Sequence, residues 1–323
     1  MSSTKDIKRR IKSVANIKKI TKAMEMVAAS KMRRAIEQVL KTRTYANLSW
    51  ETILNLSQTM ENKNEPLHLL LAPRKKVKRV GIVLITSNRG LCGGFNTAII
   101  NKVKDSIEKH QALGENIEVE AEFVLMGKKG LGVHKHGHKI VADFVKLDLA
   151  TESKEVVPVA KIIIDEFLNG YYDKVMVAYT DFVNSLKHIP RVKQILPVDI
   201  DLEDEYLGVV GKDSRVGIDK EFLKEKQKKH KSKEGIEYDY IFEPSPKEVL
   251  DEMIPRLIEV QLYQALLESN ASEHSARMTA MHQATDAAED LVDELNLYYN
   301  KARQAGITSE LAEISAGAAA LDN

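Results

Sequence analysis

The first 65 residues have the hydrophobic pattern of one long helix. They contain neither glycine nor proline, and the first helix-breaking residue is Pro66. Apolar side chains recur at steps of three and four, which places them on one face of a helix. This stripe comprises Ile7, Ile11, Val14, Ile17, Ile20, Met24 and Val27, continued by Met32, Ala35, Val39, Ala46, Ile53 and Met60. We therefore expect a continuous N-terminal helix.

The C-terminal part repeats this pattern. After Pro244 and Pro246, a helical pattern runs from about Lys247 to Leu321. Its stripe comprises Ala280, Ala284, Ala287, Leu291, Leu295, Tyr298, Ala302 and Ala305. At about 1.5 Å per residue, such a helix is on the order of 100 Å long. Two long helices with apolar stripes predict an antiparallel coiled coil of the N- and C-terminal helices.

The two predicted helices carry opposite charge. Lysine and arginine dominate residues 1–43, whereas aspartate and glutamate dominate residues 247–323. This complementarity favours pairing of the helices within the chain, although much of the charge belongs to solvated faces. A nucleic-acid-binding arm is the alternative for the basic end. The first 44 residues contain no aromatic side chain on which a base could stack, which disfavours that alternative.

Between the two helices, apolar runs of strand length alternate with helical patterns. The predicted strands are 79–86, 118–126, 139–145, 174–180, 194–199 and 238–243. The predicted helices are 95–112 and 152–169. This alternation predicts a small, Rossmann-like α/β domain with a mostly parallel sheet.

A glycine-rich turn, RGLCGGFN, follows the first predicted strand. In nucleotide-binding folds, backbone N–H groups at such a turn bind a phosphate. Here Gly90, Gly93 and Gly94 do not form G-x-G-x-x-G, and no Gly-Lys-Ser/Thr follows. We therefore interpret the glycines as a tight turn between strand and helix.

Three nearby histidines, His134, His136 and His138, raise the alternative of a metal site. No cysteine or acidic residue lies close enough in the sequence to complete a ligand set. The neighbouring residues are instead basic, and they are Lys128, Lys129, Lys135 and Lys139. Solvated loop histidines are the favoured interpretation.

Composition limits the remaining possibilities. Cys92 is the only cysteine, which excludes a disulfide within the chain. No apolar run approaches the roughly 20 residues that span a bilayer, and the start MSSTKDIKRR lacks the apolar region of a secretory signal. The polar segment 201–237 predicts an exposed insertion. We expect a helix at 1–65, an α/β domain at 75–200, this insertion, a last strand at 238–245 and a helix at 246–323.

Three blocks of the sequence resemble one family. They are IKRRIKSVANIKKITKAMEMVAASKMRRA, RGLCGGFN and ASEHSARMTAMHQATDAAEDLVDELNLYYNKARQAGITSELAEISAGAAAL. In this order they resemble the γ subunit of the F-type, proton-translocating ATP synthase. This chain has Asn88, Ser275 and Ala287 where that family usually has Asp, Ala and Asn. The insertion falls where photosynthetic relatives carry a redox-regulatory segment, but their cysteine pair is absent here.

The resemblance implies a central-stalk rotor subunit, which couples proton flow through a membrane ring to ATP synthesis or hydrolysis at an α/β hexamer. It implies no catalytic residue, cofactor or metal in this chain. The implied partners are the α, β, δ and ε subunits and the membrane c-ring, with no nucleic acid. The implied location is peripheral, on the cytoplasmic side of the bacterial plasma (inner) membrane.

The resemblance also implies functional positions. Those implied to couple to the β subunit are Met24, Arg277, Arg303, Gln304, Thr308 and Glu310. Tyr240 and Glu243 are implied to face the membrane ring and the ε subunit. Simple packing within the helix pair is an alternative role for Met24. The alternative for the whole chain is a nucleotide-binding α/β enzyme whose helices form a dimerisation arm.

Overall fold

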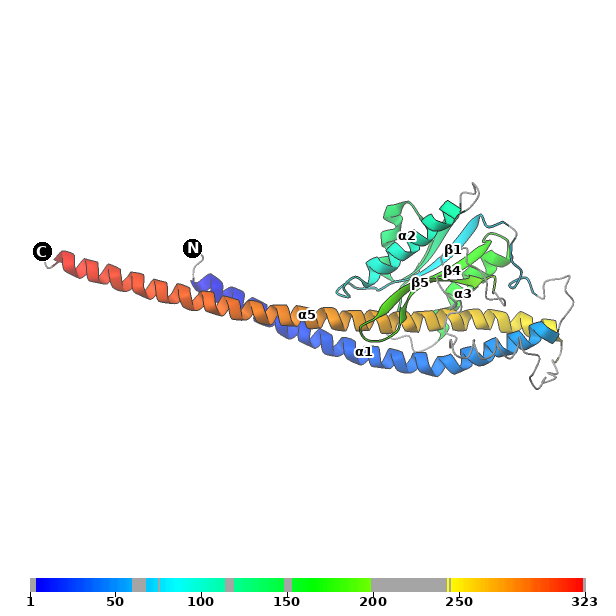
Figure 1. The fold of residues 1–323 in the computed structure, drawn as a ribbon, viewed down its shortest axis with the longest axis horizontal. Helices are drawn as coiled ribbons and strands as arrows, with labels where there is room; N and C mark the ends of the chain where they lie inside the picture. Colours follow the sequence, from blue (N-terminus) through cyan, green and yellow to red (C-terminus); the bar gives the residue numbers. More distant parts are fainter. Residues whose placement is uncertain are drawn as a thin grey trace. The chain divides into compact units, whose positions relative to one another are not determined.

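The computed structural model describes residues 4–59, 68–74, 76–113, 119–147, 153–198, 243 and 245–321. The chain divides into two compact units. We call Ser30–Ala276 the sheet unit, and Met1–Ala29 together with Arg277–Asn323 the helical unit. Two long helices, α1 (Thr4–Thr59) and α5 (Pro246–Leu321), contribute residues to both units (Figure 1).

Among the described residues, the sheet unit contains one sheet of five strands. They are β1 (Arg79–Ile85), β2 (Glu120–Met126), β3 (Lys139–Phe144), β4 (Lys174–Phe182) and β5 (His188–Leu196). Their order is β3-β2-β1-β4-β5, and only the β4–β5 pair is antiparallel. The predicted mostly parallel α/β sheet is therefore confirmed. The carboxyl ends of the four parallel strands meet at one edge, which we call the carboxyl edge.

Both faces of this sheet are covered, which explains why β1 reads as the continuous apolar run RVGIVLI. On one face, Ile82 and Leu84 pack with Ile99 and other residues of α2 (Phe95–Leu113). On the other face, Val83 packs in a cluster with α3 (Val157–Leu168) and the first half of α5. Figure 1 shows α2 on the opposite side of the sheet from α3 and α5.

The observed elements differ from the expected ones at three places. β5 begins at His188 rather than at 194, because the half-buried segment HIPRVK continues the hairpin with β4 even though it contains Pro190. A 3₁₀ helix, η1 (Lys128–His136), occupies the segment expected to be a loop. A short 3₁₀ helix, η2 (Ser153–Glu155), precedes α3, which begins at Val157 rather than at 152.

Two expected segments lie outside the described residues. They are the insertion 201–237 and, apart from Glu243 and Ser245, the last strand at 238–245. The antiparallel pairing of the long helices is confirmed within each unit. Thr42 of α1 contacts Gln264 of α5 in the sheet unit, and Thr21 contacts Thr285 in the helical unit.

A buried carboxylate joins three segments of the sheet unit. Glu122 of β2 accepts hydrogen bonds at one oxygen from Lys139 Nζ (2.6 Å) and Tyr171 Oη (2.8 Å), and at the other from Tyr172 Oη (3.1 Å). Burial opposes ionisation and by itself would raise the pKa of Glu122. The three hydrogen bonds outweigh burial and lower that pKa below its ordinary value.

We predict that Glu122→Gln lowers the free energy of unfolding at pH 7 by about 1–3 kcal/mol, because the variant loses charge-assisted hydrogen bonds. The native pKa is depressed, so this stabilisation is fully present above the unfolded value of about 4.3 and is lost as pH falls through the native value. Urea unfolding of both chains from pH 7 to pH 3.5 should show the difference shrinking toward acid. A difference that stays constant across this range would contradict the prediction.

Candidate functional site

The glycine-rich turn joins β1 to α2 at the carboxyl edge. Gly93 has a left-handed φ of 55°, as the tight-turn interpretation requires, and Leu91 shares this conformation with a φ of 63°. Two backbone donors of the turn are already bound within the chain. The Ser87 N–H donates to Asn96 Oδ1 (2.9 Å), and the Phe95 N–H donates to the Cys92 carbonyl (3.2 Å). This geometry supports a structural turn rather than a phosphate cradle.

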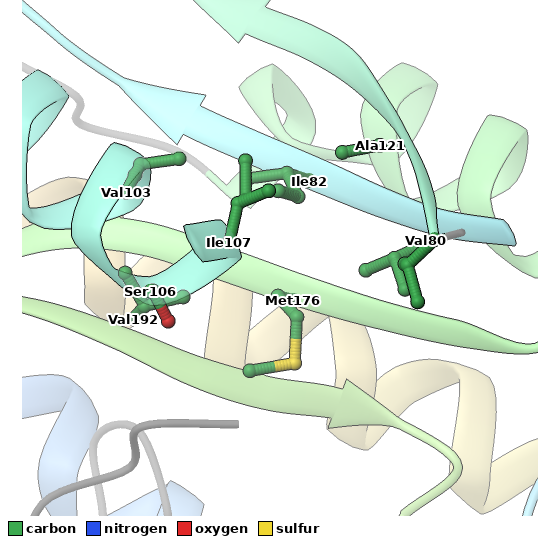
Figure 2. A pocket seen from close by; sticks show the side chains of 9 residues that line it. Val80, Ile82, Val103, Ser106, Ile107, Ala121, Met176 and Val192 are labelled. Atoms are coloured by element: carbon green, nitrogen blue, oxygen red, sulfur yellow. The ribbon is translucent and has the colours of Figure 1, made fainter. Parts of the chain in front are cut away.

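A small cavity lies between α2 and the sheet (Figure 2). Its volume is about 20 Å³, which is roughly the space of one water molecule. Ser106 is its one polar lining residue, and Val80 and Ala121 place it where β1 and β2 begin. Ligands of open α/β sheets bind instead beyond the carboxyl ends of the strands. The cavity is therefore a packing gap and not a nucleotide site.

The structure describes the side chains of two of the three histidines near β3, His134 and His138. Among the described residues, no group of three His, Cys, Asp or Glu residues could hold a metal ion. His134 is exposed, and the ring of His138 packs against Phe123 with centroids 5.2 Å apart. The side chain of His136 lies outside the described part of the chain.

Polar contacts join the two helices of the helical unit. Lys18 Nζ lies 2.9 Å from Glu289, and the hydroxyl groups of Thr21 and Thr285 lie 2.8 Å apart. Glu25 lies 3.5 Å from His282 Nδ1. These contacts alternate steps of three and four along α1, as residues that face a partner helix do. Part of this helix–helix interface is therefore polar, and Lys18–Glu289 is an ion pair between the basic and acidic helices.

This polar interface corrects part of the predicted apolar stripes. Several stripe residues are exposed by between 43% and 59%, and they are Ile17, Ile20, Val27, Leu291 and Tyr298. The residues of α1 that face α5 recur every 3.5 residues on average from Ile7 onward. The predicted stripe departs from this repeat at several positions. The sequence prediction missed that this repeat continues through the polar residues Lys18, Thr21 and Glu25.

The residues that the resemblance implies for coupling fall on both long helices. Met24 is half-buried on α1, next to Glu25. Arg277 is half-buried at the start of the α5 segment in the helical unit. The other four are exposed near the end of α5, and they are Arg303, Gln304, Thr308 and Glu310.

Within the exposed group, the structure brings two residues into contact. Thr308 Oγ1 donates to the Gln304 carbonyl (2.9 Å) one turn earlier. Arg303 and Glu310 are seven residues apart, so they lie two turns apart on one side of the helix. Glu243 is exposed shortly before α5 begins, whereas Tyr240 lies outside the described residues.

The C-terminal end of α5 is exposed on all sides of the helix. Every described side chain from residue 303 to residue 316 is exposed. Among them are the large apolar side chains of Ile307, Leu311 and Ile314, exposed by 50% to 69%. Apolar side chains that no described part of their own chain covers indicate a surface for another protein.

Comparison with known proteins gives a consistent result. The model of a family described as ATP synthase matches residues 3–321. The chain is 40% identical to the ATP synthase gamma chain of Nitrosomonas eutropha, over 99% of this chain and 100% of that one. It is 41% identical to the ATP synthase gamma chain of Aromatoleum aromaticum, with the same coverage of both chains.

Solved structures share the fold. A chain of the Euglena gracilis mitochondrial ATP synthase, in an OSCP/F1/c-ring structure, aligns with a TM-score of 0.59 at 17% identity, over 98% of this chain and 94% of that one. A chain of the Tetrahymena thermophila mitochondrial ATP synthase, in a central stalk/c-ring structure, aligns with a TM-score of 0.55 at 23% identity, over 82% of this chain and 99% of that one.

We predict that the two threonine hydroxyl groups stabilise the helical unit together. Thr21→Val and Thr285→Val keep the side-chain shape but remove the hydroxyl, so each should lower the free energy of unfolding by about 0.5–1.5 kcal/mol. The double variant should lose less than the sum, because the groups contact each other. Urea unfolding of the four chains, followed by helical circular dichroism, measures this. Additive losses would mean that the two groups act independently.

Proposed function

Because the chain belongs to the ATP synthase gamma chain family, we propose that it is the central-stalk rotor subunit of an F-type ATP synthase. In this role it rotates and couples proton flow through a membrane ring to ATP synthesis or hydrolysis at an α/β hexamer. The relatives match over their whole length, so the assignment concerns the whole chain. The subunit itself is not catalytic.

One structural observation supports the proposed function in addition to family membership. The end of α5 exposes Ile307, Leu311 and Ile314 together with polar side chains around its full circumference. An amphipathic surface helix would instead bury one stripe against its own chain. A helix exposed on all sides suits insertion into a ring of other subunits, where each side meets a partner in turn. The α and β subunits of the hexamer are the proposed partners there.

The remaining proposed partners are the δ and ε subunits of the same complex and the membrane c-ring. We propose that Tyr240 and Glu243 face the ring and the ε subunit. None of the described helices is long and apolar enough to cross a membrane. The proposed location is peripheral, at the cytoplasmic side of a bacterial plasma membrane.

The alternative of a nucleotide-binding enzyme is not favoured. Its strongest sequence feature, RGLCGGFN, forms a turn in which the Phe95 N–H, like that of the preceding Ser87, binds within the chain. The nearby cavity between α2 and the sheet is about the size of one water molecule. Tight ATP binding by the isolated chain would revive this alternative.

We propose six residues for coupling to the β subunit, namely Met24, Arg277, Arg303, Gln304, Thr308 and Glu310. Four of them lie on the exposed end of α5, where their side chains are available to a partner. Met24 and Arg277 are half-buried in the helical unit, so they combine packing with partial access. Polar side chains suit this task because directional hydrogen bonds form at particular rotation angles and break at others.

Co-purification tests the proposed assembly directly. A tagged copy of this chain, expressed in its own cells, should recover the α, β, δ and ε subunits and the c-ring from solubilised membranes. Recovery of this chain alone, or with nucleic acid, would contradict the proposed function.

We predict that replacing Arg303, Gln304 and Thr308 together with alanine lowers coupled turnover by about tenfold, equivalent to about 1.4 kcal/mol of transition-state stabilisation. Truncation from Ser315 should lower it less, because the segment it removes, SAGAAALDN, consists mainly of small or apolar residues. ATP hydrolysis and proton pumping in reconstituted vesicles measure both variants. Parent-like activity of the triple variant would exclude these residues from coupling.

A further inference from the structure

One turn of α5 is tied to the carboxyl edge of the sheet by three polar side chains. Ser272 Oγ donates to the Thr180 carbonyl (3.1 Å) near the end of β4, and Ser275 Oγ donates to the Ser185 carbonyl (2.8 Å) in the β4–β5 hairpin. Between them, Glu273 binds Lys146 Nζ (2.5 Å), which follows β3. We call Lys146, Ser272, Glu273 and Ser275 the polar clamp.

The ion pair at the centre of the clamp is almost completely buried. The side chains of Lys146 and Glu273 are exposed by 1% and 4%. The Lys146 carbonyl also accepts a hydrogen bond from Asn88 Nδ2 in the loop that follows β1. The lysine therefore links α5 to the ends of two strands, β1 and β3.

Stability does not explain this ion pair. Removing two charges from water costs several kcal/mol per ion, and buried pairs replaced by apolar residues of similar size often leave a protein equally stable. What a buried ion pair and directed hydrogen bonds add is a defined geometry. In the clamp, that geometry fixes which side of α5 faces the sheet.

The adjoining part of α5 contacts the sheet unit differently. Leu250, Ile254, Leu257, Ile258, Leu262 and Leu266 are buried in the apolar core. Apolar burial is strong but non-directional, so it stabilises the contact without strongly opposing a small rotation of the helix about its axis. The clamp adds directional contacts to those of this mainly apolar stretch, in which Asp251 lies 3.0 Å from His68 and Glu268 shares a hydrogen bond with Tyr179 of β4. It lies in the last turn of α5 assigned to the sheet unit, which ends at Ala276.

We propose that the polar clamp is the torque-bearing joint between the sheet and α5, and that Lys146, Ser272, Glu273 and Ser275 are positioning residues for energy coupling. This inference rests on the proposed rotor function. Torque applied to α5 at its exposed end reaches the sheet unit only if the helix does not turn against the sheet. The clamp prevents that slip because any rotation of α5 breaks the ion pair and both serine hydrogen bonds together.

The test replaces the ion pair by apolar residues in the complete ATP synthase. Lys146→Met combined with Glu273→Leu keeps the buried volume and removes both charges of the pair. ATP hydrolysis and ATP-driven proton pumping are measured in the same reconstituted vesicles. We expect hydrolysis to continue, while protons pumped per ATP hydrolysed fall by about twofold or more. A purely structural role would lower the amount of complex and both activities together, and leave the ratio unchanged.

A matched control is available on the same helix. The exposed Arg256 and the half-buried Glu259 form an ion pair at 3.0 Å within α5. Arg256→Met combined with Glu259→Leu removes the same charges without touching the carboxyl edge, so the ratio should equal that of the parent. A second variant, Ser272→Ala with Ser275→Ala, keeps the ion pair and should lower the ratio by a smaller factor.

The possible results distinguish failure of the clamp proposal from failure of the proposed rotor function. If the ion-pair variant assembles and pumps with the parent's ratio, the clamp proposal is wrong. If that variant does not assemble, the serine variant decides, and a parent-like ratio overturns the proposal. If the complex with the parent chain shows no proton pumping that depends on this chain, the proposed rotor function is wrong. The clamp proposal is then wrong as well, because it rests on that function.

Discussion

The packing of α5 against the sheet is the interaction on which the rest of the sheet unit depends. A mostly parallel sheet is apolar on both faces, so it needs helices on both. α2 covers one face, and the cluster containing Val83 and Ile85 is completed on the other by α3 and by α5 residues such as Leu257 and Leu262. Because α5 is one unbroken helix of 76 residues, the element that completes this core also carries the exposed C-terminal surface. Fold and function therefore share one helix.

The two long helices meet differently in the two units. In the sheet unit, α1 contributes small or apolar side chains such as Ala35, Val39 and Ala46, all buried. In the helical unit, hydroxyl and charged groups take over part of the interface, as the 2.8 Å contact between Thr21 and Thr285 shows. Polar groups at such positions define the register of the helices, because each must meet its partner on the other helix. The apolar side chains displaced from this interface, including Ile20, are exposed and available to another protein.

Much of this structure could be predicted from the sequence, because its main elements are long or strongly patterned. The absence of glycine and proline before Pro66 predicted α1, and the run RVGIVLI predicted the central strand. The strand β5 was predicted too short because the segment HIPRVK before Gln194 has no continuous apolar run, whereas pairing with β4 fixes the strand from His188 onward. The helix interface was partly misassigned because a hydrophobic stripe was followed where a strict 3.5-residue repeat continues through polar residues. The polar clamp could not be foreseen, since no spacing in the sequence links Lys146 to Glu273, which are 127 positions apart.

A rotor and an enzyme use buried polar groups for different ends. An active site keeps reactive groups accessible to a substrate, with ionisation poised near the working pH. Two buried carboxylates of the described residues are held by partners of the same chain, Glu122 by Lys139, Tyr171 and Tyr172, and Glu273 by Lys146. Such pairing lowers the chemical reactivity of the carboxylate but makes it a rigid connection between elements. A subunit that transmits force needs such connections where segments distant in sequence meet, and that is where both of these carboxylates lie.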